Sequence, residues 1–213
     1  EALPFLKVTV APENVSEDQV RGLADAGVLV SLGHSDADFA TCQRYVEAGA
    51  RCATHLFNAM SQLGNREPGL VGAALANGGL NAGLIADAVH VHPATMRAAW
   101  AAKTEPGRIF LVSDAMAVAG TDATEFDLEG RRITRRNGVL TLADGTLAGA
   151  DLDLTRALQV LVDKVGVSLD EALQAAITVP SGLIGQPSEL GALEDTIRIS
   201  ADLSGLKPLI DIP

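Results

Sequence analysis

The stretch that decides the fold is Val28-Leu29-Val30-Ser31-Leu32-Gly33-His34, an apolar run that ends on a glycine and a histidine. Its nearly continuous apolar character predicts a strand covered on both faces, as strands of parallel sheets are. Similar runs occupy four other stretches, namely Leu6–Ala11, Cys52–Phe57, Ala82–Asp87 and Ile109–Asp114. The five starts lie 22, 24, 30 and 27 residues apart, which is the spacing of strands that are each followed by a crossover helix.

Helical segments are predicted between and after these strands. Ser16 is a candidate N-cap, and Gly27 follows the last apolar position of the helix that Ser16 begins. A second helix is expected over Ala37–Ala48, and Pro93 fits the first turn of a third that runs to about Lys103. Two more helices are expected over Asp153–Val165 and Leu169–Ile177.

Five βα units fit either an open doubly wound sheet or part of a barrel. The open, dinucleotide-binding type needs a glycine-rich turn after the first strand, but Ala11-Pro12-Glu13 stands there. A barrel is favoured because the polar residues gather at strand ends, although a (β/α)8 barrel needs eight strands. A sixth strand is possible near Gly145–Ala150. We therefore expect an incomplete TIM-type barrel, with two or three units before residue 1.

The segment at about 124–147 differs from the βα pattern. It is charged and contains two turn dipeptides, Asn137-Gly138 and Asp144-Gly145, which predict β-hairpins. The tail Ser188–Pro213 shows no clear helix. We expect a hairpin insertion in the first segment and the end of the barrel unit near residue 187.

Composition excludes several classes of partner. The chain of 213 residues is 47% apolar and 20% charged, enough apolar residues for a large core. Its net charge of −11 argues against binding to nucleic acid or to an anionic membrane surface, and 3% aromatic residues are too few for base stacking. The stretch Gly69–Val89 contains too many glycine and polar residues to span a membrane.

The expected setting is the cytoplasm. Cys42 and Cys52 are the only two cysteines, so a disulfide framework is not expected. The chain opens on Glu1 without the basic segment of a secretory signal peptide, and without an initiator methionine. We expect a processed or truncated N-terminus.

All four histidines lie at or just beyond predicted strand ends. His34 and His55 follow adjacent strands and are the best candidate pair of metal ligands, although a single histidine in such a place is usually structural. His90 and His92 follow the fourth strand, after Asp87. Imidazole ligands suit zinc first, with iron, cobalt or manganese as alternatives. A catalytic site needs a third ligand, which we expect to be a carboxylate before residue 1.

Asp114 ends the apolar run Leu111-Val112-Ser113. A carboxylate at the end of a buried strand is costly unless it is paired, binds a metal or does chemistry. Next to an activated water, Asp114 could act as general base and then as general acid. The alternative is a cap for the loop that follows.

Two loops carry weaker signals. Arg66 lies in Gly64-Asn65-Arg66-Glu67-Pro68-Gly69, where a guanidinium suits an anion such as a phosphate, or forms a salt bridge to Glu67. The small residues of Gly145–Ala150 would let a ligand approach the backbone closely.

Taken in order, these motifs resemble the N-acetylglucosamine-6-phosphate deacetylases of the amidohydrolase superfamily. The resemblance runs to about residue 195, and its most specific blocks are His55–Met60 and Arg66–Gly69. The other matching blocks are Thr9–Glu13, Gly33–Ala37, His90, Ser113–Ala115 and Gly145–Gly149.

The resemblance implies a metal-dependent hydrolase on a (β/α)8 barrel with a small β-sandwich. Residues 1–187 would form the incomplete barrel and residues 188–213 a remnant of the sandwich. His34 and His55 would bind the metal, and Asp114 would be the catalytic base and acid. The residues expected to contact substrate are Asn58, Ala59, Ala148, Gly149 and Ala150 for the sugar, and His90 and Arg66 for the phosphate.

The resemblance also implies a homodimer, because the arginine that matches Arg66 reaches the site of the partner subunit in such enzymes. The reaction would hydrolyse the acetamide of N-acetylglucosamine 6-phosphate to acetate and glucosamine 6-phosphate. The family's third metal ligand is a glutamate upstream of residue 1, and Glu13 belongs to a different motif. The alternatives are an amidohydrolase that acts on a cyclic amide or deaminates a ring, and a non-catalytic fragment that binds sugar phosphate.

Overall fold

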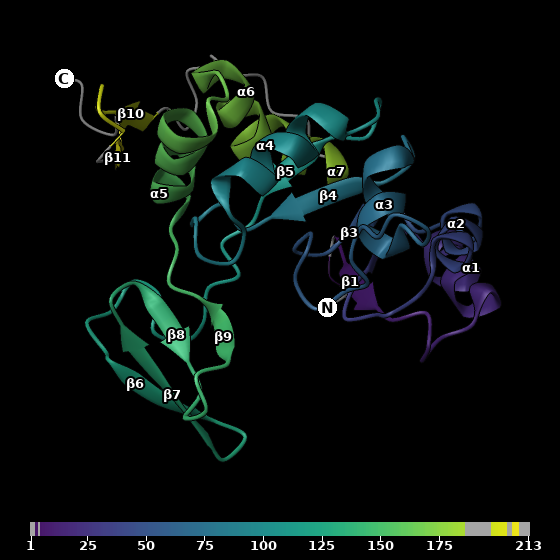
Figure 1. The fold of residues 1–213 in the computed structure, drawn as a ribbon, viewed down its shortest axis with the longest axis horizontal. Helices are drawn as coiled ribbons and strands as arrows, with labels where there is room; N and C mark the ends of the chain where they lie inside the picture. Colours follow the sequence, from purple (N-terminus) through teal and green to yellow (C-terminus); the bar gives the residue numbers. More distant parts are fainter. Residues whose placement is uncertain (1–2, 4, 186–196, 204–205, 209–213) are drawn as a thin grey trace.

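The computed structural model describes residues 3, 5–185, 197–203 and 206–208. Its central feature is a parallel sheet of five strands in the order β1-β2-β3-β4-β5 (Figure 1). The strands are β1 (Lys7–Val10), β2 (Leu29–Leu32), β3 (Cys52–Ala53), β4 (Asn81–Leu84) and β5 (Ile109–Leu111). The prediction of five parallel strands is confirmed.

Several strands are shorter than the apolar runs that predict them. The run Cys52–Phe57 leaves the sheet after Ala53, and the run Ile109–Asp114 leaves it after Leu111. The physical reason is a backbone turn, because His55, Phe57 and Asp114 have positive φ angles of 31°, 76° and 50°. A left-handed residue cannot continue an extended strand.

Helices connect successive strands. They are α1 (Glu17–Asp25), α2 (Phe39–Glu47), α3 (Gly69–Ala76) and α4 (Pro93–Ala102). Ser16 caps α1 in a capping box with Gln19, and Pro93 is the first residue of α4, as the sequence predicts. The sequence does not predict α3. Since seven of its eight residues are buried, α3 lacks the polar face by which an amphipathic helix is recognised.

A second sheet stands apart from the first (Figure 1). It is antiparallel, with strands β6 (Glu125–Leu128), β7 (Arg131–Arg136), β8 (Val139–Thr141) and β9 (Leu147–Ala150). The expected hairpin turn lies at Asn137-Gly138, where φ is 54° and 74°. Val118, Ile133 and Leu140 form a small core of its own.

The expected sixth strand near Gly145–Ala150 is wrong as a member of the parallel sheet. β9 pairs antiparallel with β8, its neighbour along the chain. One parallel bridge between Ala115 and Ala150 connects it to the residues after β5. The short turn at Asp144-Gly145 makes the local pairing inexpensive, because little chain entropy is lost in closing so short a loop.

The predicted C-terminal helices are present with irregular turns. The first is α5 (Leu154–Gln159) followed by the π-helix η1 (Val160–Val165). The second is α6 (Leu169–Leu173), the π-helix η2 (Gln174–Thr178) and α7 (Val179–Leu183). It therefore extends beyond the predicted end at Ile177, because Pro180 lies in the first turn of α7, where proline is tolerated.

The strands β10 (Ile197–Ile199) and β11 (Leu206–Pro208) pair antiparallel. Most of residues 188–213 lie outside the described part of the chain, so the expected sandwich remnant stays a prediction. Among the described residues, no helix combines the length and hydrophobicity needed to cross a bilayer.

The main core lies between the parallel sheet and its helices. Val30 and Leu32 of β2 and Leu84 of β4 are fully buried, and they pack in one cluster with Val20 of α1 and Leu70 of α3. Because this packing fixes each strand, it also fixes the loops at the carboxyl ends of the strands, where the candidate residues lie.

Candidate functional site

His34 and His55 lie next to each other at the carboxyl ends of β2 and β3. Their Nε2 atoms are 2.8 Å apart, and the ring centroids are 4.7 Å apart at an interplanar angle of 68°. The two strands are neighbours in the sheet, which brings together residues 21 positions apart. The structure therefore places the predicted pair so that one nitrogen of each ring faces the other.

The backbone at these strand ends is unusual. His34 and His55 have positive φ angles of 51° and 31°, and Asp114 after β5 has 50°. L-residues rarely take this conformation, which costs about 1–2 kcal/mol each. Such strain is concentrated at functional sites, where it aims a side chain in a direction that the strand alternation does not give.

His55 is held in its neutral form. His55 is only 6% exposed, and this burial lowers the pKa of its imidazole. The nearby Asp114 carboxylate acts in the opposite direction and raises the same pKa. Neutral imidazole is the form that binds metal ions, so His55 is ready as a ligand at neutral pH.

The two imidazoles fit part of a divalent metal site. Both Nε2 atoms converge on one place, so a single ion there would meet one nitrogen of each ring. No group of three or more His, Cys, Asp and Glu side chains suited to a metal occurs among the described residues. Two nitrogen ligands are therefore present, while a third protein ligand is not found within this part of the chain.

The loop after His34 is held by a residue to which the sequence alone assigns no role in the site. Oε1 of Glu13 accepts hydrogen bonds from Ser35 Oγ at 3.0 Å and from the Asp36 amide at 2.8 Å. Burial raises the pKa of Glu13, but hydrogen bonds lower it, and the net pKa lies below the usual value. The ionised carboxylate thus fastens the backbone next to His34.

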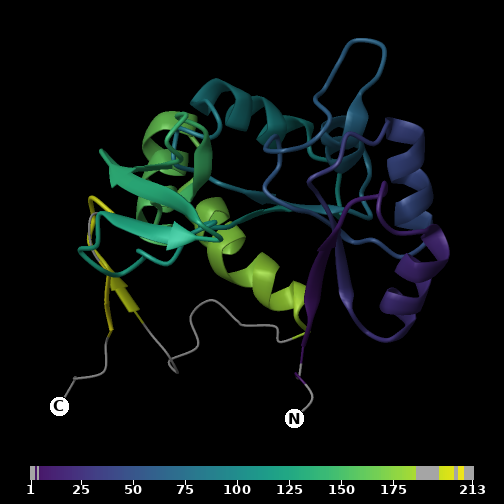
Figure 2. The same cartoon turned by 90° about the horizontal axis from the view of Figure 1, so that it is seen from below.

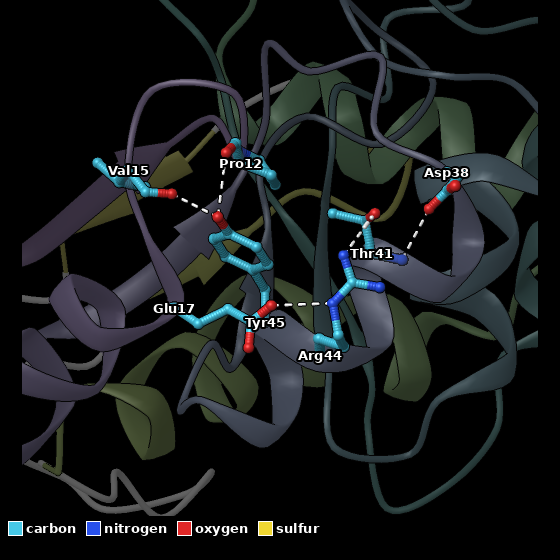
Figure 3. A network of polar contacts seen from close by, with 7 residues as sticks. All are labelled: Pro12, Val15, Glu17, Asp38, Thr41, Arg44 and Tyr45. Atoms are coloured by element: carbon cyan, nitrogen blue, oxygen red, sulfur yellow. Dashed lines mark hydrogen bonds and ion pairs between the residues drawn. The ribbon is translucent and has the colours of Figure 1, made fainter.

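The loop that carries Glu13 is in turn fastened to α2 (Figure 3). The Tyr45 hydroxyl lies within hydrogen-bond reach of the carbonyl oxygens of Pro12 and Val15. On the same helix, Nε of Arg44 donates to Glu17 at 2.9 Å. The helix that follows His34 therefore also holds the loop that positions it.

Asp114 and the turn Ala148–Ala150 are brought together. The Ala150 amide donates to the Asp114 carbonyl at 2.8 Å. A side chain at Gly149 would place its Cβ 2.4 Å from Met116 Cγ and 3.0 Å from the same carbonyl, so only glycine fits. Asp114 itself is exposed, which corrects the expectation of a buried carboxylate: its side chain extends from the turn that follows the buried strand.

A cavity of about 370 Å³ lies next to this turn. Ala115 and Ala150 line it together with Arg135 and Asp151, whose side chains are 2.8 Å apart. Neither histidine of the pair lines this cavity. The cavity therefore adjoins the predicted site at Ala150 and does not include the histidine pair.

Asn58 and Ala59 follow His55 directly and link the two histidine loops. The Asn58 side-chain amide donates to the carbonyls of His55 and Leu56, each at 3.2 Å. The Ala59 carbonyl accepts from the Ser35 amide at 3.2 Å. These two of the five residues predicted to contact the sugar thus lie beside the histidine pair.

His90 follows β4, the strand between those of His55 and Asp114. Its Nδ1 is 2.6 Å from Oδ2 of Asp87, and the two side chains are 7% and 9% exposed. Burial raises the pKa of Asp87, but hydrogen bonds from His90 and from backbone amides lower it, and the net shift is downward.

Arg66 lies in the loop between β3 and α3, which projects from the body of the molecule (Figure 2). It is exposed, and the alternative salt bridge to Glu67 does not form. Oε1 of Glu67 instead accepts from the amides of Phe39 and Gly69, at 2.7 and 2.9 Å. Glu67 thereby braces the loop and leaves the guanidinium of Arg66 at the surface.

The chain is similar in sequence to known deacetylases of amino-sugar phosphates. No protein-family model matches it. It is 41% identical over 189 residues to an N-acetylgalactosamine-6-phosphate deacetylase from Shewanella sp. (strain ANA-3), covering 88% of this chain and 47% of that protein. It is also 41% identical over 151 residues to an N-acetylglucosamine-6-phosphate deacetylase from Bacillus subtilis (strain 168), covering 69% of this chain and 37% of that protein.

A solved structure of a deacetylase is similar to this chain in fold. An N-acetyl-D-glucosamine-6-phosphate deacetylase variant from Mycobacterium smegmatis, in complex with N-acetyl-D-glucosamine-6-phosphate, superimposes with a TM-score of 0.84 at 30% identity. The match covers 92% of this chain and 54% of the other. The chain thus spans about half the length of the relatives it matches.

Proposed function

Because the chain belongs to the family of N-acetylhexosamine-6-phosphate deacetylases, we propose that it carries the catalytic half of a metal-dependent deacetylase of amino-sugar phosphates. The substrate is N-acetylglucosamine 6-phosphate, and the products are glucosamine 6-phosphate and acetate. The observation that carries the proposal is the convergence of His34 and His55 at neighbouring strand ends, beside Asp114.

His34 and His55 would hold one divalent ion, with zinc as the first expectation and iron, cobalt or manganese as alternatives. When bound, such an ion lowers the pKa of water toward about 7, so that hydroxide is available at neutral pH. Burial keeps His55 neutral for this task.

Asp114 moves the proton. Its exposed carboxylate accepts the proton of the attacking water while the water oxygen forms a bond to the acetamide carbon. As the bond between that carbon and nitrogen breaks, Asp114 returns the proton to the departing nitrogen, which leaves as the amine of glucosamine 6-phosphate. The Ala150 amide fixes the backbone of Asp114, so the carboxylate stays in place through both transfers.

The substrate lies across the strand ends that surround these groups. Asn58 and Ala59 contact the sugar from one side, and Ala148, Gly149 and Ala150 contact it from the other. His90 holds the phosphate. The surface position of Arg66 suits a contribution to the phosphate site of a second copy in a homodimer.

The five-stranded sheet supports an incomplete (β/α)8 barrel of the amidohydrolase kind over residues 1–187, with residues 188–213 as part of a small β-sandwich. The substrate class, the two free cysteines and the acidic composition are consistent with a cytoplasmic enzyme.

The decisive experiment measures hydrolysis of four compounds by the metal-loaded protein, as acetate release from the three acetylated sugars and as ring opening of the cyclic amide. The compounds are N-acetylglucosamine 6-phosphate, N-acetylgalactosamine 6-phosphate, unphosphorylated N-acetylglucosamine and a cyclic amide. We expect the first to be hydrolysed fastest. The second is the closest competitor, since the two phosphorylated sugars differ only in one hydroxyl configuration. A faster galactosamine reaction would reassign the sugar, and equal rates with and without phosphate would refute the phosphate site. Turnover of the cyclic amide alone would indicate another kind of amidohydrolase.

A further inference from the structure

Asp87 and His90 form a nearly buried pair, and the proposed reaction uses only His90. Oδ2 of Asp87 is 2.6 Å from Nδ1 of His90. Oδ1 of Asp87 accepts from the amides of Val89 and His90, at 2.8 Å each. All three contacts lie within one turn after β4, so the carboxylate is fixed before it meets the imidazole.

We propose that Asp87 is a positioning residue that keeps His90 protonated at Nδ1, so that Nε2 is the atom His90 presents to the phosphoryl group. The inference rests on the proposed function, since the phosphate is that of the substrate. It adds Asp87 to that function, as the residue that decides which nitrogen of His90 faces the phosphate.

The assignment of the proton follows from the chemistry of the pair. An ionised carboxylate only accepts hydrogen bonds, so Nδ1 of His90 must be the donor at 2.6 Å. The lowered pKa of Asp87 agrees with an ionised carboxylate at neutral pH. In neutral imidazole one nitrogen carries the proton, so Nε2 is then left with its lone pair.

Nε2 is the nitrogen that remains for a ligand. No described residue forms a hydrogen bond with it, and it is not among the fully buried unpartnered atoms of the described chain. When Nε2 gains a proton from solvent or from the phosphate monoanion, His90 becomes a cation that donates to a phosphate oxygen.

The backbone on both sides of His90 is fixed. Ala88 has a positive φ of 64°, which forms the turn that brings His90 back to Asp87. Val91 is buried, and His92 caps α4 by accepting a hydrogen bond from the Ala94 amide at 3.1 Å. The turn and the helix cap hold the backbone on both sides of His90. The direction of its ring is then set by the side-chain contact with Asp87.

The first test determines the tautomer of His90 directly in the unmodified protein. Nitrogen-15 NMR of the His90 imidazole distinguishes a proton on Nδ1 from one on Nε2. We expect the neutral ring of the unmodified protein to carry its proton on Nδ1, and a proton on Nε2 would overturn the proposal whether or not any variant folds.

The variant Asp87→Asn then moves the proton. The amides of Val89 and His90 require an acceptor, so the side-chain oxygen of Asn stays with them and its NH₂ group faces Nδ1. Nδ1 must then accept, and we expect the proton on Nε2. A spectrum unchanged from that of the unmodified protein would contradict the proposal. Asp87→Glu, which keeps the negative charge, should leave the proton on Nδ1, and a proton on Nε2 in this variant would also contradict the proposal.

The second test measures binding of inorganic phosphate, which does not depend on deacetylation. We expect Asp87→Asn to weaken binding about tenfold, because the ring of the variant still donates from Nε2 but stays neutral, so the hydrogen bond to phosphate loses its positive charge. In turnover, KM for the phosphorylated sugar should rise by about the same factor while kcat stays within about twofold. The exposed Asp18→Asn is the matched control and should change neither quantity.

The outcomes separate the two proposals. Absence of acetate release, with the tautomer and phosphate results as expected, refutes the deacetylase and leaves the role of Asp87 in anion binding. Normal acetate release with unchanged KM and phosphate affinity in Asp87→Asn refutes the role of Asp87 alone.

Discussion

The Nε2 atoms of His34 and His55 are 2.8 Å apart, although the residues follow different strands and are separated by 21 positions. This relationship depends on the pairing of β2 with β3, in which Leu32 is opposite Ala53. Each histidine follows its strand by two residues and turns through a left-handed backbone. The sheet and the turns together produce the convergence.

Replacing either histidine should remove the metal. We expect His34→Ala and His55→Ala each to lose at least about 90% of the bound ion, because loss of a ligand leaves too few donors for tight binding. Metal content by elemental analysis of the purified protein is the measurement. His92→Asn is the control, since Asn also caps a helix and His92 lies outside the pair. Full metal content in both alanine variants would exclude the assignment.

Replacing Asp114 should remove turnover and leave the fold intact. Because its side chain is exposed, Asp114→Asn should change the unfolding temperature little. We expect kcat to fall at least about 10²-fold, the usual contribution of a general acid and base. Asp144→Asn is the matched control, because Asp144 accepts from the Thr146 amide in a hairpin turn and Asn can do the same. Near-normal turnover of Asp114→Asn would remove the residue from the mechanism.

Gly149→Ala should disturb Asp114 through the backbone. Both Gly149 and Gly138 have positive φ, at 73° and 74°, so alanine costs each about 1–2 kcal/mol of stability. Only at Gly149 would the new Cβ collide with Met116 and the Asp114 carbonyl, whereas at Gly138 no atom lies within 4 Å. We expect Gly138→Ala to keep its activity and Gly149→Ala to lose most of it. Denaturant unfolding and acetate release measure the two effects, and equal activities would show that the turn does not set the position of Asp114.

Arg66→Ala should weaken binding of the phosphorylated sugar and leave stability unchanged, because Arg66 is exposed and Glu67 braces the loop independently. We expect KM to rise about tenfold or more, the order of a charged hydrogen bond to phosphate. Arg131→Ala, an exposed arginine of β7, is the control and should keep KM, since its ion pair is a surface one. Unchanged KM in Arg66→Ala would argue against a role in phosphate binding.

Acid should reduce the contribution of the Asp87–His90 pair to the stability of the folded protein. The pKa of Asp87 is lower in the folded protein than in the unfolded chain, so its contribution is complete above the unfolded value of about 3.9. It is lost as the pH falls through the lower, folded value. Thermal unfolding between pH 7 and pH 3 should show a smaller loss of stability in Asp87→Asn than in the unmodified protein. An identical pH dependence of the two would mean that the pair adds no stability.

The sequence predicts the parallel sheet because each strand is a compact apolar run, and Val28–Gly33 is typical. It predicts the site to the extent that residues at the ends of adjacent parallel strands must be neighbours, as His34 and His55 are. It does not predict α3, whose apolar residues have no polar face to give a period, nor the antiparallel pairing of β9.

The supporting residues could not be predicted in the same way. Glu13 and Ser35 meet across a separation of 22 positions, and the contact depends on tertiary packing. Asp87 stands three residues before His90, but only the turn at Ala88 directs its carboxylate to the ring. In the chain the recognisable signal is a polar residue after an apolar run, and the hydrogen-bond partner of that residue is seen only in the folded structure.

The order of the parallel sheet has a consequence for biosynthesis. Every parallel strand after β1 pairs with the strand one unit earlier, so each pairing becomes possible soon after the next unit leaves the ribosome. β2 can therefore add to β1 before β3 exists, and β5 with Asp114 joins last. When the nascent chain has emerged from the exit tunnel as far as β4, the histidine pair can already form, while Asp114, the proposed general base and acid, still lies inside the tunnel.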